Sequence, residues 1–118
     1  MTNPKISLQE TFYKKVAALT EDASTGIVLP SGEIHGLHRF RANGADPQAY
    51  VRLVWDYGGA GETIIASTRG DIDLLWDSGD VAHQYTGDGS LKMHIVIENN
   101  NDSQSPFIGG EFEMVKVN

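Results

Sequence analysis

The chain of 118 residues contains no cysteine, which excludes disulfide bonds, thiolate catalysis and cysteine-based zinc sites. It also lacks runs of basic residues: nine Lys and Arg stand against sixteen Asp and Glu, a net charge of −7. Such a chain repels a phosphate backbone, so nucleic acid is not an expected partner. Apolar runs are only a few residues long, so no membrane-spanning segment is expected either.

The length fits one domain over residues 1–118, with one core and one site or surface. Residues 1–7 show no periodic pattern and form a candidate N-terminal arm. The first twenty residues have no continuous apolar stretch of the kind found in signal peptides. The sequence therefore predicts that the chain folds in the cytoplasm where it is made.

Two stretches alternate between apolar and polar residues, which is typical of strands half-buried in an antiparallel sheet. In the first, residues 50–57, the alternation places Val51, Leu53, Trp55 and Tyr57 on one inward face. In the second, residues 91–98, Leu91, Met93, Ile95 and Ile97 face inward, and Val96 is the only apolar residue on the outer face. We therefore expect Trp55 and Tyr57 to be core residues.

Turn signals separate several further candidate strands. A glycine-rich loop predicts a hairpin between residues 50–57 and 62–68, and Asp88-Gly89 predicts a tight turn before residue 91. Pro30-Ser31-Gly32 predicts a second hairpin, and a change of phase within residues 107–117 predicts a β-bulge near Met114. The expected strands at these places cover residues 26–29, 33–41, 62–68, 83–86 and 107–117.

Residues 7–20 fit two interpretations. A capping-box pattern from Ser7 to Glu10 and apolar residues at helical spacing favour a helix, whereas alternating residues and the surrounding strands favour a strand. The whole chain shows seven to nine elements about ten residues apart and no alternation of strands with helices. These features predict an all-β, single-domain antiparallel β-sandwich of jelly-roll type.

The sequence carries no nucleophile elbow, phosphate loop or dinucleotide fingerprint, so we expect neither an enzyme nor a cofactor. His35 and His38 are three residues apart, which on a strand places them on opposite faces and argues against a shared metal ion.

The carboxylates of one segment form a candidate calcium site, because calcium prefers several oxygen ligands from a flexible loop. This segment lacks the third acidic position and the central glycine of an EF-hand loop, and a solvated strand face is the alternative. The four candidate ligands are Asp71, Asp73, Asp77 and Asp80.

Two aromatic residues, Trp76 and Tyr85, lie outside the clearest core pattern. Exposed rings serve either as stacking platforms for sugars or as anchors in protein interfaces. We therefore treat Trp76 and Tyr85 as candidate contacts to a glycan or to a protein partner.

Four segments together resemble small β-sandwich structural proteins of tailed bacteriophages. They are Gly26-Ile-Val-Leu-Pro-Ser-Gly-Glu-Ile-His-Gly-Leu-His-Arg-Phe, Tyr50-Val-Arg-Leu-Val-Trp-Asp-Tyr-Gly-Gly, Leu91-Lys-Met-His-Ile-Val-Ile-Glu-Asn-Asn and Phe107-Ile-Gly-Gly-Glu-Phe. The resemblance covers most of the chain at the level of pattern, and its motifs are shared by many jelly-roll modules. It implies a virion component of the capsid-decoration, neck or tail-accessory type, with residues 7–20 as the first strand and no catalytic residues.

Two functional hypotheses follow. The first is a non-enzymatic virion protein that assembles as a homo-oligomer and binds other virion proteins. The second is a carbohydrate-binding module that recognises glycans through exposed aromatic residues such as Trp76 and Tyr85.

Overall fold

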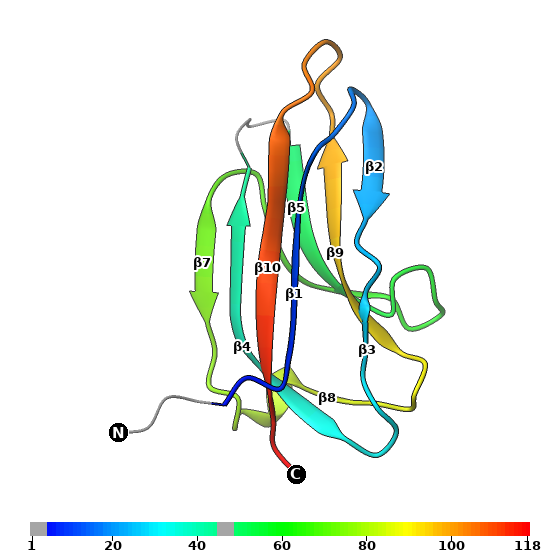
Figure 1. The fold of residues 1–118 in the computed structure, drawn as a ribbon, viewed down its shortest axis with the longest axis vertical. Coiled ribbons are helices and arrows are strands. Elements are labelled where there is room, and N and C mark those ends of the chain that lie inside the picture. Colours follow the sequence, from blue (N-terminus) through cyan, green and yellow to red (C-terminus); the bar gives the residue numbers. More distant parts are fainter. Residues whose placement is uncertain (1–4, 45–48) are drawn as a thin grey trace.

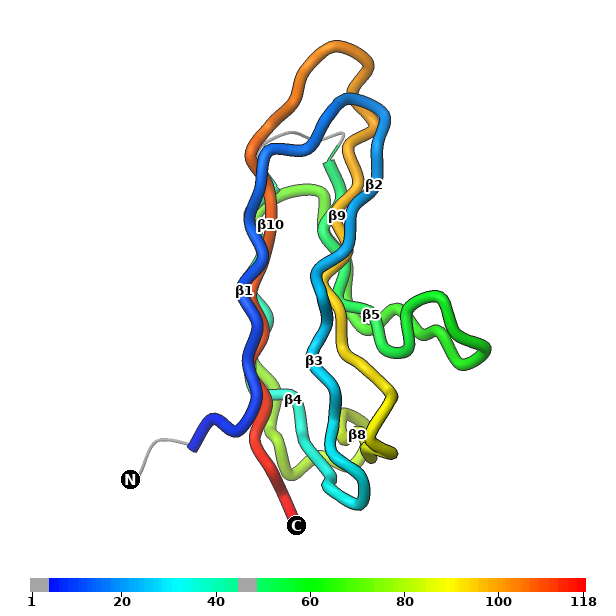
Figure 2. The backbone as a smooth tube through the Cα atoms, turned by 45° about the vertical axis from the view of Figure 1, so that its right-hand side comes forward, coloured from blue at the N-terminus to red at the C-terminus, as the bar shows by residue number. Residues whose placement is uncertain are grey.

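Two antiparallel β-sheets packed face to face make up the protein, as a computed structural model that describes residues 5–44 and 49–118 shows (Figures 1 and 2). Strand order is β1-β10-β4-β7 in sheet A, where β8 also pairs with β4, and β2-β9-β5-β6 in sheet B, where β3 also pairs with β9. The strands are β1 (Leu8–Lys15), β2 (Thr20–Ala23), β3 (Ile27–Val28), β4 (Ile34–Asn43), β5 (Ala49–Trp55), β6 (Thr63–Thr68), β7 (Ile72–Leu75), β8 (Gln84–Thr86), β9 (Lys92–Asn99) and β10 (Phe107–Lys116); a short 3₁₀ helix, η1, spans Val81–His83.

The strand pairings are nested along the chain. The first strand pairs with the last, β1 with β10, and successive inner pairs follow as β2 with β9, β4 with β7 and β5 with β6, all antiparallel. This nested wrap over two sheets is the jelly-roll arrangement. The predicted all-β sandwich of jelly-roll type is therefore confirmed.

The core lies between the sheets and follows from the alternation of the central strands. Val51 and Leu53 of β5 face inward, as predicted, and Phe40 of β4 lies directly opposite Phe112 of β10. Burying these side chains supplies the main favourable free energy of folding. The core consists of Val16, Leu29, Leu37, Phe40, Ala42, Ala49, Val51, Leu53, Met93, Ile95, Ile97, Ile108, Phe112 and Met114.

Residues 7–20 form strand β1 and the beginning of β2, so the helical interpretation is wrong and the strand interpretation is correct. Pairing with β10 along the whole of β1 bonds the backbone groups on one edge of this segment, which fixes it as a strand. Leu19, with φ of 56°, turns the chain between the two strands and so prevents a continuous helix.

The predicted bulge near Met114 is confirmed by the register of β10 against β4. Met114 lies opposite Leu37 and Glu113 lies opposite Arg39, so His38 is the extra residue on β4.

Two turns that looked local in the sequence connect different sheets. The expected hairpin at Pro30-Ser31-Gly32 is wrong, because it joins β3 of sheet B to β4 of sheet A, and the Asp88-Gly89 turn likewise joins β8 to β9. The two turns are bonded to each other: Gly87 donates to the Glu33 carbonyl at 2.8 Å, and Gly89 donates to the Leu29 carbonyl at 3.1 Å. They close one end of the sandwich together.

Candidate functional site

Trp76 and Tyr85, the predicted aromatic contacts, are both half-buried and packed against the core. The Trp76 ring lies 5.8 Å from the His83 ring, and the Tyr85 ring lies 5.1 Å from that of Trp55. Burial raises the pKa of the Tyr85 hydroxyl. Because part of each ring is enclosed, neither forms a fully open stacking surface, and their proposed contact role stays a prediction.

Two exposed apolar side chains occur near Trp76, one at the end of the sheet-edge strand β7 and one at the start of η1. Leu75 is 68% exposed and Val81, at the start of η1, is 78% exposed. The turn between them approaches β4 so closely that a Cβ on Gly36 would lie 2.2 Å from the Ser78 carbonyl oxygen. We call Leu75 and Val81 the β7–η1 patch.

The four candidate calcium ligands are distributed over separate local structures. Asp73 on β7 accepts a hydrogen bond from Arg39 Nε at 2.8 Å, Asp77 accepts one from the Gly79 amide, and Asp80 caps η1 by accepting from the Ala82 amide. Asp71 is exposed. Within residues 5–44 and 49–118, no group of three His, Asp or Glu side chains is arranged to hold a metal ion.

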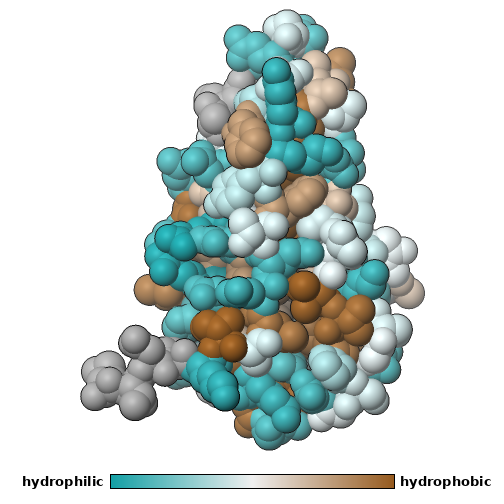
Figure 3. Space-filling model, viewed as in Figure 1, coloured by the Kyte–Doolittle hydropathy of each residue, from teal (hydrophilic) through white to brown (hydrophobic). Residues whose placement is uncertain are grey.

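The outer face of sheet A is mostly hydrophilic, with a few hydrophobic patches in its lower half (Figure 3). Two ion pairs cross it, Arg39 with Asp73 and Arg41 with Glu111. Exposed pairs of this kind contribute little to stability, but they compensate the charge of Asp73 at the sheet edge.

A polar chain centred on the buried His35, which sequence reasoning missed, links Ser7, His35 and Glu33. The His35 ring is 1% exposed; its Nδ1 lies 2.8 Å from Ser7 Oγ and its Nε2 lies 2.9 Å from Glu33 Oε1. Because a carboxylate only accepts, Nε2 donates to Glu33. The Ser7 hydroxyl also lies 3.1 Å from the Met114 carbonyl oxygen, so this polar chain connects the residues before β1 to β4 and β10.

Sequence reasoning missed this chain because no spacing rule links residues such as Ser7 and His35, which are 28 positions apart. Residues 1–4 of the predicted arm lie outside the described residues.

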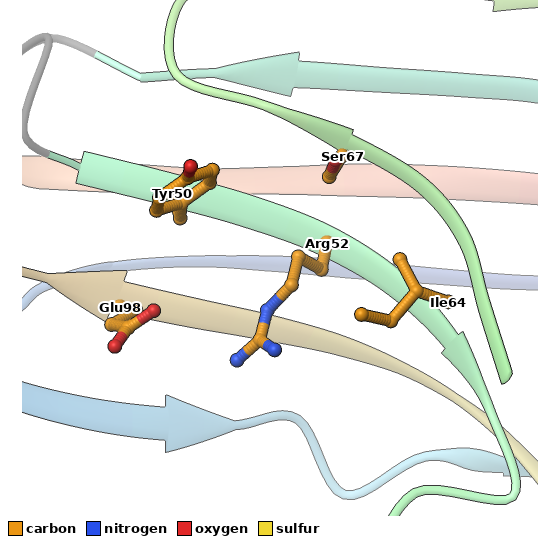
Figure 4. A pocket seen from close by; sticks show the side chains of 5 residues that line it. All are labelled: Tyr50, Arg52, Ile64, Ser67 and Glu98. Carbon is orange, nitrogen blue, oxygen red and sulfur yellow. The ribbon is translucent and has the colours of Figure 1, made fainter. Parts of the chain in front are cut away.

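The outer face of sheet B carries a cavity of about 320 Å³ that sequence reasoning also missed. Its walls come from three neighbouring strands, and Figure 4 shows Arg52 extending from β5 across β9. Arg52 lies opposite Ser67 on β6, and Tyr50 lies opposite Glu98 on β9. The lining residues are Tyr50, Arg52, Ile64, Ser67 and Glu98.

Arg52 is held in place by an ion pair with Glu21 of β2. To reach Glu21 it passes over Val96, which lies opposite Arg52 in the register and is fully buried although it is on the outer face. Its Nε–H is enclosed and has no acceptor among the described residues. The Arg52 side chain is thus held by its bond to Glu21, and its Nε–H remains able to donate another hydrogen bond.

Tyr57 belongs to this outer face, so its predicted place in the core is wrong. Asp56, with φ of 56°, ends β5 and reverses the alternation, and the loop that follows projects away from sheet B (Figure 2). The Tyr57 ring lies 5.5 Å from that of His94, and burial raises the pKa of its hydroxyl. Trp55, by contrast, packs against the core as predicted.

Comparison with protein-family models, with curated proteins and with solved structures gave no match. The resemblance to bacteriophage structural proteins therefore stays a prediction. Among the described residues there is no helix long and apolar enough to cross a bilayer.

Proposed function

We propose that this protein is a non-enzymatic structural component of a virion, of the capsid-decoration, neck or tail type, that assembles through protein–protein contacts. The observation that carries the proposal is the β7–η1 patch, where two large apolar side chains are more than two-thirds exposed at the edge of sheet A. Exposed apolar groups of this kind are typical of interaction surfaces.

The partner is a second copy of the chain. Among residues 5–44 and 49–118, β7 pairs with β4 on one side and with no strand on the other, which leaves that edge for another strand. Antiparallel pairing of two β7 strands about a two-fold axis would extend sheet A over both copies and place Leu75 of each copy against β7 of the other. The charge of Asp73, which would otherwise discourage such pairing, is compensated by Arg39 of the same chain.

Light scattering after size exclusion tests the proposal. We expect a discrete oligomer for the natural chain and a monomer for Leu75→Ser and Val81→Ser. The matched control is Leu19→Ser, which removes an equally exposed leucine, 67% accessible, outside the patch. A natural chain that is monomeric at every concentration would contradict self-assembly, as would oligomers that survive both patch substitutions.

Repeating the measurement with calcium and with a chelator separates the patch from the acidic segment. We expect the oligomer to be indifferent to both. Dissociation by the chelator would instead assign the contact to residues 71–80 acting as calcium ligands. The virion location has a separate test, because purified particles that encode this chain should contain it in stoichiometric amounts.

A further inference from the structure

The cavity on the outer face of sheet B has the size of a site for one small ring. Its volume of about 320 Å³ lies at the lower end of the range of small-molecule pockets, about 300–1,000 Å³. It lies on three hydrogen-bonded strands rather than on loops, so its walls are fixed relative to one another.

The polar groups of the cavity have hydrogen-bonding capacity that the described part of the chain does not use. Arg52 Nε–H has no acceptor in that part of the chain. The side chains of Tyr50, Ser67 and Glu98 take part in no hydrogen bond within residues 5–44 and 49–118. Arg52 can only donate, Glu98 as a carboxylate can only accept, and the two hydroxyls can do either.

The charges nearest the cavity balance. Arg52 and the Arg69 guanidinium, which lies 4.1 Å from the centre of the Tyr50 ring, are opposed by Glu21 and Glu98. An anionic ligand would meet the two carboxylates and a cationic one the two guanidinium groups. The face therefore favours a neutral ligand with groups that both donate and accept.

The strand register contains one pair that destabilises the folded chain. Glu98 lies directly opposite Glu21, and like charges in a cross-strand pair are destabilising. Arg52 bonds to Glu21 and leaves Glu98 facing the cavity. A role in binding a ligand would explain why a carboxylate occupies this position.

We propose that this cavity binds a single neutral sugar ring, through Arg52 donating to one hydroxyl and Glu98 accepting from its neighbour. Ser67 and the Tyr50 hydroxyl add further bonds, and Ile64, which is 53% exposed, contacts the C–H surface of the ring. Vicinal hydroxyls supply the paired acceptor and donor that these side chains lack. The site lies on sheet B, away from the β7–η1 patch on sheet A, and so does not depend on the proposed assembly.

The test is a backbone-amide NMR titration with the methyl glycosides of glucose, galactose, mannose and N-acetylglucosamine. At least one glycoside should shift the signals of Tyr50, Arg52, Ser67 and Glu98 together. Glu98→Gln should weaken that binding by about tenfold, because a charge-assisted hydrogen bond is replaced by a neutral one. The same substitution should raise the midpoint of urea unfolding, because it removes the repulsion with Glu21.

The matched control is Glu113→Gln, the same chemical change on sheet A, which should leave the dissociation constant unchanged. The proposal is overturned if none of the four glycosides shifts these signals, or if Glu98→Gln binds as tightly as the natural chain. Shifts centred on Trp76 and Tyr85 would overturn it in favour of those aromatic residues. Inorganic phosphate shifting the Arg52 signals more than any glycoside would assign the cavity to an anion.

Discussion

Asn99 offers the sharpest test of how the open end of the sandwich is held together. It is fully buried at the end of β9; its Nδ2 donates to the Val16 carbonyl at 3.0 Å and to the Gln104 carbonyl at 2.8 Å, and its Oδ1 accepts from the Asn101 amide at 3.0 Å. Removing a side chain that makes three such bonds, each worth about 0.5–1.5 kcal/mol, should cost about 3 kcal/mol. For a domain of this size that lowers Tm by roughly 12 °C.

Urea unfolding of Asn99→Ala beside Asn100→Ala measures this cost, since Asn100 is the exposed neighbour on the same turn. Asn99→Asp adds a second readout. At neutral pH its carboxylate would face two carbonyl oxygens, so burial and repulsion would raise its pKa, and the variant should gain stability as acid protonates it. A loss below about 1 kcal/mol for Asn99→Ala, or an equal loss for Asn100→Ala, would refute the reasoning.

Two other substitutions test local geometry. Burial lowers the pKa of His94 below its usual value of 6.5, so between the lowered value and 6.5 the unfolded chain binds the proton more readily than the folded chain. The free energy of unfolding should therefore fall as the pH drops through that window. His94→Gln should reduce this fall, which urea midpoints measured across the window would show. Gly36→Ala would place a Cβ 2.2 Å from the Ser78 carbonyl oxygen and should cost about 1–3 kcal/mol in urea unfolding. Gly70→Ala, whose Cβ would meet nothing within 4 Å, should cost nothing measurable; equal losses for the two glycine variants would contradict the close approach of the turn to β4.

The fold was accessible from the sequence because its strands carry strong local patterns. The alternation in residues 50–57 reflects one sheet face that packs on the core and one that faces solvent. The predicted bulge near Met114 is present, but its extra residue, His38, lies on β4, and β10 keeps its phase, with Met114 buried and Val117 37% exposed. Residues 7–20 were ambiguous because apolar residues at positions such as Leu8 and Phe12 satisfy both periods over a short stretch. Only pairing with β10, which is about a hundred residues away in the chain, decides between them.

The candidate site could not be predicted from the sequence in the same way, because the pairing of strands that are distant in the sequence brings its residues together. Val96 was correctly placed on the outer face, but its burial depends on Arg52 reaching across β9 to Glu21. The error at Tyr57 has a local cause that alternation does not report, the positive φ of Asp56. A pattern of period two predicts which face a residue is on and leaves open what covers that face.

The positions of the two proposed surfaces make a joint prediction. Leu75 lies on the edge strand of sheet A, whereas Glu98 lies on the outer face of sheet B, and the core separates the two sheets. Substitutions at sites without shared partners act independently. Leu75→Ser should therefore abolish the oligomer and leave glycoside affinity per chain unchanged, and Glu98→Gln should weaken glycoside binding and leave the oligomer intact. If either substitution changed both measurements, sugar and partner would have to meet on one surface, and the separate assignment of the two sheets would be wrong.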